Sequence, residues 1–567
     1  MPSSLEIAQA ARLRPLAEVA AELGLSPSEV EPHGRHAAKV DLSALRRVEA
    51  AGGPAGSLVV VTAVTPTPSG EGKTTTAIGL TDALRRLGTR AALTVRQPSL
   101  GPVFGIKGGG NGGGRAQVVP METFNLHLTG DFHAVATAHN LAAAMLDNHL
   151  NHGNPLGVEP GSVVWPRVVD MNDRPLRDAV VGLGGRSNGP VREAEWTITA
   201  ASEVMAALSL AEGVSDLRRR LGRMVLARNR QGRPVTAEKL KAAGAMAALL
   251  AEAVKPNLMQ TLEGSPVLVH TGPFGNIAQG TSSVLADRLA LRLAEVVVTE
   301  AGFGADLGAE KFFDLKCRQS GLRPAAAVVV ATIRALKHHG GKGRGKKAAA
   351  LDAALAEPDP DAVRRGCENL RLQVENVLAF GVPAVVALNA HPADRPEEHR
   401  VAREAALEAG AREAVVATHY AEGGAGAVDL ARAVSAAAAE AAPGFRLLYP
   451  DEMPLSRKIE EVAARIYRAA GVDFSRGAAA QLEDLTELGH GRLPVCMAKT
   501  PFSFSHDPLL GPNPKGFRLP VREVRLYAGA GYVTALTGEI VLMPGLPERP
   551  AAEDIDLAED GRIVGLR

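Results

Sequence analysis

The sequence is poor in cysteine, in aromatic residues and in long apolar runs, and each absence excludes a class of protein. Its 567 residues include only three cysteines, Cys317, Cys367 and Cys496, whose number and spacing fit neither a disulfide framework nor a CxxC metal site. The longest apolar runs, such as 325–331, are far too short to span a bilayer. The first residues lack a basic stretch followed by an apolar core, so they show no secretion signal. We therefore expect a reduced, cytoplasmic setting and no membrane partner.

A charge excess of either sign is also missing. Lysine and arginine number 63 and aspartate and glutamate 62, which leaves a formal net charge of +1. Since nonspecific binding of nucleic acid requires a basic surface, we expect no nucleic-acid partner. A basic stretch, Gly340–Lys347, has no interleaved aromatic residues and is interpreted as a solvated connector. Aromatic residues make up only 4% of the chain, so a ring beside a glycine-rich loop is notable.

Short runs rich in valine and alanine recur along the chain and are separated by helical stretches. They are continuously apolar, which is typical of strands that helices cover on both faces. The pattern predicts an α/β fold with a mostly parallel sheet flanked by helices, as in P-loop nucleotide-binding proteins. Ligands of such sheets bind beyond the carboxyl ends of the strands. The predicted strands are 58–64, 91–95, 267–271, 296–299, 326–331, 384–389 and 414–418.

The chain is too long for one compact core and is predicted to form three domains. Residues 1–350 would form a nucleotide-binding domain with a helical insertion near 200–255, a stretch rich in Ala, Leu and Met. Residues 351–445 would form a further α/β domain that contributes to a ligand site. Beyond them, short strands with turns predict a smaller mixed domain over 446–567.

A glycine-rich turn between the first of these strands and a helical segment carries the strongest chemical signal. A strand, a glycine-rich turn and a helix in this order are typical of a site that binds a nucleoside triphosphate, because backbone N–H groups and the helix N-terminus face the phosphates. Lys73 supplies a point charge there, and the Thr74 hydroxyl can ligate Mg²⁺. Thr67 stands where the usual pattern has its first glycine, and a turn that only reverses the chain is the alternative. The predicted binding residues are Thr67, Pro68, Ser69, Gly70, Glu71, Gly72, Lys73 and Thr74.

The second of these strands ends in Arg96, which is followed by Gln97 and, further on, by a glycine run from Lys107 to Gly114. An arginine at the end of an adjacent strand can reach toward the phosphate loop and hold a carboxylate or phosphoryl group at two points. A surface ion pair is the alternative. The glycine run lets the backbone approach a ligand or close as a lid, and a plain flexible loop is nearly as compatible with it.

Several long motifs together resemble those of formate–tetrahydrofolate ligase, also called formyltetrahydrofolate synthetase. The resemblance extends from Ile7 to Pro547, nearly end to end, and each motif is individually specific. It implies an ATP-dependent ligation of formate to N10 of tetrahydrofolate, which yields 10-formyltetrahydrofolate, ADP and phosphate in one-carbon metabolism. The motifs are, in chain order, Thr67–Thr76, Arg96–Gly101, Lys107–Gly114, Asn125–Ala134, Thr299–Phe312 and Pro494–Thr500.

The resemblance also implies roles for the residues singled out above. ATP would convert formate to formyl phosphate, while Lys73, the loop amides and Mg²⁺ neutralise charge that spreads over the γ-phosphoryl group. Arg96 would hold formate in line and then steady the formyl phosphate. Lys73 and Arg96 are thus the predicted catalytic residues, with Thr74 as the Mg²⁺ ligand.

In the family the pterin ring of the folate lies between planar side chains, and this chain departs from the pattern there. His391-Pro392 stands where Phe-Pro is usual, and Tyr420 takes the place of Trp. Both replacements keep a flat ring, so the predicted folate-binding residues are Phe303, His391, Pro392 and Tyr420. For His391, an ordinary loop position is an equally open interpretation.

The family is activated by a monovalent cation, K⁺ or NH₄⁺, held partly by acidic and backbone oxygens. Asp131 matches one such position, whereas Gln97 stands where Glu is common, so cation dependence would be weaker here. The resemblance further suggests a homotetramer and a folate substrate with or without a polyglutamate tail.

Other functions remain compatible with the phosphate loop alone. A P-loop ATPase that switches protein partners would share the loop and the sheet but would hydrolyse ATP without formate or folate. A catalytically inactive scaffold is disfavoured because Lys73, Thr74, Arg96 and Asp131 are all present. The histidines at 127, 133 and 139 lack acidic or cysteine ligands at zinc-like spacing, so they predict a polar segment close to the nucleotide.

Overall fold

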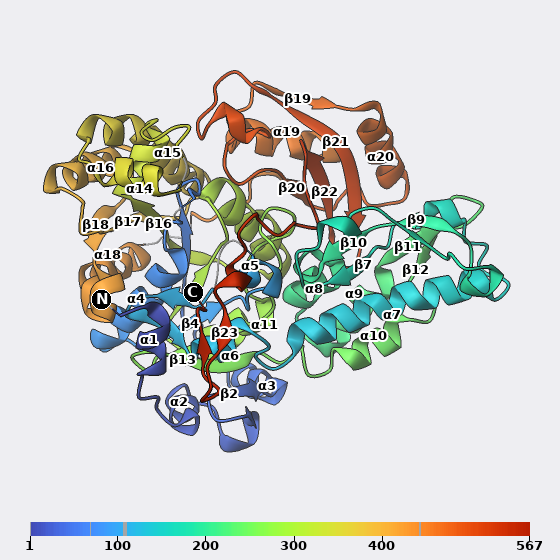
Figure 1. The fold of residues 1–567 in the computed structure, drawn as a ribbon, viewed down its shortest axis with the longest axis horizontal. Coiled ribbons are helices and arrows are strands. Elements are labelled where there is room, and N and C mark those ends of the chain that lie inside the picture. Colours follow the sequence, from blue (N-terminus) through green and yellow to red (C-terminus); the bar gives the residue numbers. More distant parts are fainter. Residues whose placement is uncertain (1, 69, 106–109, 347, 441–443, 567) are drawn as a thin grey trace.

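The computed structural model describes residues 2–68, 70–105, 110–346, 348–440 and 444–566. Within these residues a 12-stranded sheet forms the centre of the main body (Figure 1). Its strand order is β1-β2-β13-β14-β4-β15-β3-β16-β17-β18, with β6 beside β13 and β5 beside β6. The strands are β1 (Val30–His33), β2 (Ala37–Val40), β3 (Ser57–Ala63), β4 (Ala91–Val95), β5 (Gly112–Gly113), β6 (Ala116–Val119), β13 (Asn257–Thr261), β14 (Pro266–Val269), β15 (Val296–Glu300), β16 (Pro324–Thr332), β17 (Ala384–Asn389) and β18 (Glu413–Ala417).

From β14 to β18 all neighbouring strands of the sheet are parallel, and the strands on the other side of β14 pair antiparallel. The predicted mostly parallel α/β fold is confirmed. Every apolar run predicted as a strand is a strand of this sheet, with ends that shift by no more than two residues.

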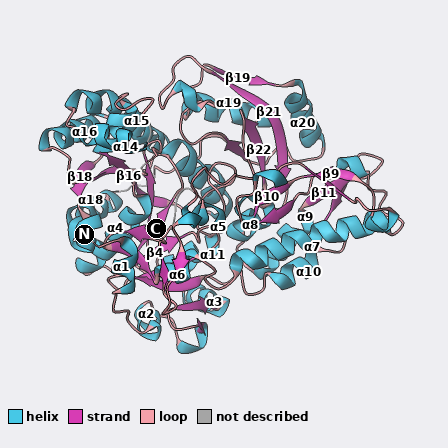
Figure 2. Ribbon diagram, viewed as in Figure 1, coloured by secondary structure: helices cyan, strands magenta, loops and turns pink. Residues whose placement is uncertain are grey.

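Consecutive side chains of the parallel strands point to opposite faces, and helices cover both faces (Figure 2). Val59 and Val61 of β3 pack in one cluster with helices α4 and α18, whereas Leu58 and Val60 pack in another with α11 and α15. Burial on both faces explains the continuous apolar runs, since each fully buried valine side chain contributes roughly 1.5–3 kcal/mol to the free energy of folding. The helices around the sheet are α1 (Ser4–Gln9), α2 (Leu16–Glu22), α3 (Leu42–Ala51), α4 (Lys73–Arg86), α5 (Leu100–Phe104), α6 (Met121–Asn125), α11 (Val284–Leu293), α13 (Ile333–His339), α14 (Ala348–Ala356), α15 (Pro360–Ala379), α16 (Pro396–Glu408), α17 (His419–Glu422) and α18 (Val428–Ala439).

Between β6 and β13 the chain leaves the sheet and forms an insertion, on the right in Figure 1. The sequence predicts helices near 200–255, and three are there, but an antiparallel strand pair lies between them. Its turn is stabilised by Asn229, whose side-chain oxygen accepts from the N–H groups of Gln231 and Arg233, and by Gly232 at a φ of +73°. The elements are α7 (Asp131–Asn151), β7 (Arg167–Val169), β8 (Ala179–Val181), β9 (Arg192–Ala194), β10 (Trp196–Ile198), α8 (Glu203–Leu210), α9 (Val214–Arg223), β11 (Val225–Arg228), β12 (Pro234–Thr236) and α10 (Ala243–Leu249).

The C-terminal part forms a sheet of its own, in the order β19-β21-β22-β20, at the top of Figure 1. The last hairpin returns to the main body, where Gln9 of α1 donates to the carbonyl of Ile563 at 3.0 Å. Residues 351–445, by contrast, add β17 and β18 to the central sheet. The predicted domain boundaries otherwise stay a prediction. The C-terminal elements are α19 (Leu455–Arg465), β19 (Gly471–Phe474), α20 (Arg476–Glu487), β20 (Val495–Ala498), β21 (Arg518–Tyr527), β22 (Tyr532–Thr537), β23 (Asp556–Leu557) and β24 (Ile563–Val564).

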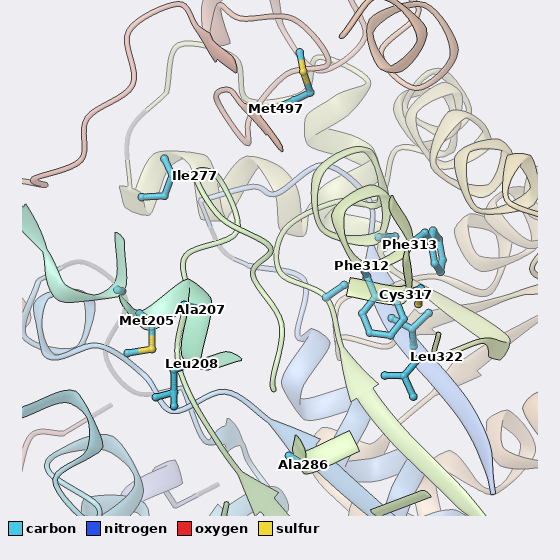
Figure 3. Close-up of a cluster of buried hydrophobic side chains, with 14 of the residues drawn as sticks. Met205, Ala207, Leu208, Ile277, Ala286, Phe312, Phe313, Cys317, Leu322 and Met497 are labelled. Atoms are coloured by element: carbon cyan, nitrogen blue, oxygen red, sulfur yellow. The ribbon is translucent and has the colours of Figure 1, made fainter. Parts of the chain in front are cut away.

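The segment that follows β15 is buried and partly π-helical, over Ala305–Ala309 and Phe312–Cys317. Figure 3 shows Phe312, Phe313 and Cys317 from this segment among the buried side chains that surround it. Cys317, Cys367 and Cys496 are free and buried. In the described part of the chain, no helix combines the length and the apolar character needed to cross a membrane.

Candidate functional site

The predicted phosphate loop runs from the end of β3 to the start of α4, and Ser69 lies outside the described residues. The loop bends at Gly70 and Gly72, whose φ angles of +73° and +79° are rarely adopted by residues with side chains. Thr67 donates to Oε1 of Glu71 through its N–H at 2.7 Å and through its hydroxyl at 2.9 Å, while Pro68 is exposed beside it. Thr67, which stands where the usual pattern has its first glycine, therefore links the start of the loop to Glu71 near its end.

Lys73 and Thr74 are the first two residues of α4. The Lys73 side chain is half-buried, and its ammonium has neither a hydrogen-bond nor an ion-pair partner among the described residues. The N-terminus of a helix carries unpaired N–H groups and a partial positive charge. An anion placed here would meet a free ammonium and backbone amides.

Glu300, the last residue of β15, connects this loop to Arg96. The Thr74 hydroxyl donates to Oε2 of Glu300 at 2.7 Å, and Oε1 lies 3.8 Å from Nη2 of Arg96. The prediction that Arg96 ends the strand next to the phosphate loop is wrong, because β15 lies between β3 and β4. Strand order is set by long-range pairing, which the sequence does not reveal. The buried Glu300 carboxylate bridges the two groups across the intervening strand.

The Arg96 guanidinium is held in place by its contacts but retains N–H groups that can donate to a ligand. Its Nη1 donates to the carbonyl of Pro273 at 2.9 Å, and its buried Nε has no partner among the described residues. Burial lowers the pKa of Arg96 while the Glu300 charge counters that effect, and an arginine stays protonated in proteins. A Cβ on Gly302 would lie 2.9 Å from Nη2, so this glycine makes room for the fork. Donors therefore remain for a carboxylate.

Gln97 and Asp131, the predicted cation ligands, differ in how they are engaged. Gln97 is buried, and its Oε1 has no hydrogen-bond partner among the described residues. The Asp131 carboxylate is already bound, by the Lys39 ammonium at 2.6 Å and the Asn257 amide at 2.7 Å. Burial lowers the pKa of Lys39, and Asp131 acts against this. The structure thus offers one free oxygen, from Gln97, and a carboxylate that a lysine already neutralises.

The four predicted folate contacts lie on two sides of the phosphate loop. Phe303 follows β15 with a φ of +63°, and a Cβ on Gly275 would come within 3.1 Å of its ring. His391 and Pro392 are exposed after β17, and Tyr420, 52% exposed, follows the neighbouring strand β18. The structure brings these three to one end of the sheet, and β3 and β16 separate them from Phe303.

The second half of the glycine run is bonded to its surroundings and holds the Tyr420 backbone. The N–H of Arg115 donates to the carbonyl of Tyr420 at 2.8 Å, and a Cβ on Gly114 would lie 2.1 Å from that oxygen. The N–H of Gly110 donates to a side-chain oxygen of α6 at 2.7 Å. Residues 110–114 are therefore part of the framework, while Lys107–Gly109 of the predicted lid lie outside the described residues.

His139 belongs to the insertion. Its ring stacks on Trp165 with centroids 4.2 Å apart, and both ring nitrogens are bonded, to Ser202 and to the carbonyl of Pro166, each at 2.8 Å. Burial lowers the pKa of His139 to about 4, so the ring is neutral at pH 7. In the ranges that the structure describes, no three His, Cys, Asp or Glu side chains are grouped to hold a metal ion.

The sequence prediction assigns no role to three residues that hold the parts of the site together. Glu300, Asn389 and His419 each end or closely follow a buried strand, where polar residues are expected to lie near a ligand, but their partners are set by the fold. Lys39 is different, because it lies in the short strand β2 and reaches its partner only through the fold.

Comparisons with known proteins agree with one another. The family model described as Formate--tetrahydrofolate ligase matches residues 2–567. Similar curated proteins include Formate--tetrahydrofolate ligase of Roseiflexus sp. (strain RS-1), 58% identical, and that of Saccharopolyspora erythraea, 56% identical; both alignments cover 100% of each chain. Formate--tetrahydrofolate ligase 1 of Rubrobacter xylanophilus is 55% identical over 100% of this chain and 99% of its own length.

Proposed function

This chain belongs to the formate–tetrahydrofolate ligase family and ligates formate to tetrahydrofolate in an ATP-dependent reaction, and we propose that the reaction passes through formyl phosphate held between Lys73 and Arg96. One observation carries this proposal: Glu300 contacts both Thr74 of the phosphate loop and the Arg96 guanidinium. The phosphate loop, which would bind the nucleotide, and Arg96, which would bind formate, therefore share Glu300 as a partner. The reaction requires the transferring phosphoryl group and formate to meet.

In the first step, an oxygen of formate attacks the γ-phosphorus of ATP, the bond to the β–γ bridging oxygen breaks, and ADP leaves. The Lys73 ammonium and the loop N–H groups neutralise charge on the transferring phosphoryl oxygens. Arg96 aligns the formate carboxylate, because a planar guanidinium can bind both carboxylate oxygens at once.

In the second step, N10 of tetrahydrofolate attacks the formyl carbon, the carbon–oxygen bond to phosphate breaks, and the N10 proton is released. Phosphate leaves with an oxygen that came from formate. Positioning the two reactants contributes up to about 7–11 kcal/mol of the barrier reduction. Tyr420 and His391 would flank the pterin ring, and Phe303 would be a third contact, since flat rings stack on a planar ligand.

Mg²⁺ fits the loop at Thr74. The Thr74 hydroxyl donates a hydrogen bond to Glu300, which leaves oxygen lone pairs for a cation that prefers hard oxygen ligands. When bound, Mg²⁺ would neutralise negative charge on the nucleotide phosphates. Thr74 would be its protein ligand, and Glu300 would hold that ligand in place.

An isotope experiment tests the formyl phosphate route. Formate labelled with ¹⁸O is supplied with ATP and tetrahydrofolate, and the released phosphate is analysed by mass spectrometry. The proposal expects one ¹⁸O atom in each phosphate. Unlabelled phosphate, released at the same rate as 10-formyltetrahydrofolate, would rule the route out.

Replacing Glu300 by glutamine is expected to lower kcat roughly 10-fold or more and to raise the Mg²⁺ concentration needed for half-maximal activity. The amide keeps the shape but removes the charge that faces Arg96, and hydrogen bonds to charged groups contribute about 1.5–3 kcal/mol. Titration of activity with MgCl₂ measures both effects. Glu295→Gln, at the exposed start of the same strand region, is the control that should behave as wild type. An unchanged Mg²⁺ requirement in Glu300→Gln would contradict the bridging role.

The monovalent cation is proposed to bind at the free oxygen of Gln97, where it would meet no uncompensated negative charge. Activation by K⁺ should therefore be weak, and Gln97→Glu should strengthen it, because a carboxylate adds the missing charge. Rates in KCl and in tetramethylammonium chloride at equal ionic strength measure the activation. The exposed Gln231→Glu is the control. Equal activation in wild type and Gln97→Glu would remove Gln97 from the cation site.

The proposal also includes the assembly and the setting. We expect a homotetramer in the cytoplasm that accepts tetrahydrofolate with or without a polyglutamate tail. Three buried thiols suit a reducing compartment. Sedimentation of the purified protein checks the tetramer.

A further inference from the structure

A side chain from β17 is hydrogen-bonded directly to the phosphate loop, although strand β16 lies between β17 and β3. The amide nitrogen of Asn389, the last residue of β17, donates to the carbonyl of Glu71 at 2.9 Å. A Cβ on Gly72 would lie 3.0 Å from the same nitrogen, so the loop backbone and this amide are in close contact. The bond fixes the peptide that immediately precedes Gly72 and the start of α4.

Thr76, in the first turn of α4, continues this connection to the next strand. Its hydroxyl lies within hydrogen-bonding distance of the Asn389 side chain, at 2.9 Å from Nδ2, and also donates to the Gly72 carbonyl at 2.9 Å. The same hydroxyl lies 3.3 Å from Nε2 of His419, the residue before Tyr420. Burial lowers the pKa of His419 to about 4, so at pH 7 the contact is between neutral groups.

The packing around these bonds leaves little room for independent motion. Thr76 is fully buried, and His419 is 1% exposed. A Cβ on Gly79 of α4 would lie only 2.6 Å from Cβ of His419, so this helix and the loop after β18 are in direct contact. The N–H of Ala390 donates to the carbonyl of Ala417, which ties the ends of β17 and β18 together.

We propose that Asn389, Thr76 and His419 are positioning residues that couple nucleotide binding at the phosphate loop to folate binding at His391 and Tyr420. The inference rests on the proposed folate site. A phosphate that orients the loop peptides orients the Glu71 carbonyl and the first turn of α4, and both are bonded to the strand ends that carry the two rings. Nucleotide therefore prearranges the pterin contacts, and by thermodynamic linkage folate tightens nucleotide binding by the same factor.

The test is the dissociation constant of tetrahydrofolate, measured calorimetrically with and without Mg²⁺–ADP in the absence of formate, so that no turnover occurs. Wild type is expected to bind folate at least about fivefold tighter with nucleotide, within the usual range of coupling between sites. Thr76→Val keeps the buried volume but removes the hydroxyl, and it should reduce this factor below about twofold. Thr76→Ser keeps the hydroxyl and should retain the wild-type factor.

Asn389→Ala is the second variant and should also lose the coupling. It should still bind tetrahydrofolate alone and Mg²⁺–ADP alone with affinities close to those of wild type. Its matched control is Asn188→Ala, which removes an asparagine-to-carbonyl bond of the same kind from an exposed loop of the insertion. A structural defect would weaken the binding of each ligand measured alone. Loss of a positioning residue would instead change the ratio of the tetrahydrofolate dissociation constants measured with and without Mg²⁺–ADP.

The outcomes separate this inference from the proposed function. If folate does not bind, or if Tyr420→Ala leaves its dissociation constant unchanged, the proposed folate site fails. If folate binds at Tyr420 but its affinity is the same with and without Mg²⁺–ADP, the coupling fails. The coupling also fails if Thr76→Val or Asn389→Ala keeps the full factor.

Discussion

Replacing Lys73 by alanine is expected to lower kcat by roughly 100- to 1,000-fold, the usual effect of removing one preorganised group that faces developing charge. The ammonium has no partner among the described residues, and it stands at the start of α4 where phosphate would bind. The variant loses stabilisation of the γ-phosphoryl group rather than a structural contact. A coupled assay of ADP formation, with formate and tetrahydrofolate both saturating, measures the loss.

Lys346→Ala is the control for this prediction, because Lys346 is an exposed lysine on the basic connector. It should keep wild-type kcat. The thermal unfolding midpoint of Lys73→Ala should also stay near the wild-type value. A Lys73→Ala variant that retains more than about a tenth of the wild-type kcat would contradict the assigned role.

Arg96→Ala is expected to reduce kcat/KM for formate by at least about 100-fold, while the affinity for ATP changes little. Two charge-assisted hydrogen bonds to a carboxylate contribute about 1.5–3 kcal/mol each, and each 1.4 kcal/mol corresponds to a factor of ten. Arg96→Lys keeps the charge but loses the two-point fork, so it should fall between the alanine variant and wild type. Initial rates over a range of formate concentrations provide the comparison.

Arg90→Ala gives the matched control for Arg96→Ala. Arg90 lies just before β4 and Arg96 just after it, and the Arg90 side chain is exposed and pairs with Glu295 at 3.2 Å. Its loss should leave formate kinetics unchanged. Normal formate kinetics in Arg96→Ala would show that the carboxylate is held elsewhere.

Much of the framework follows from the sequence, because it depends on local patterns. The continuous apolar runs identify the parallel strands, since helices bury both faces of that part of the sheet. The strand, glycine turn and helix around Lys73 likewise form where the pattern predicts. Each of these signals is made by residues that lie close together in the sequence.

The relations between strands do not follow from the sequence. Arg96 is separated from the phosphate loop by β15, and it is Glu300 at the end of that strand that connects them. Lys39 neutralises Asp131 across 92 positions of the chain. Such contacts depend on strand order and on the path of the insertion, so only the fold reveals them.

The central claim is that Lys73 and Arg96 hold opposite ends of one acyl phosphate. A crystal structure of the protein with Mg²⁺, ADP and carbamoyl phosphate, an analogue in which an amino group replaces the formyl hydrogen, tests it most directly. The account predicts the Lys73 ammonium within hydrogen-bonding distance of the phosphoryl oxygens and the Arg96 guanidinium within that distance of the acyl oxygen. An analogue bound away from either side chain would contradict it.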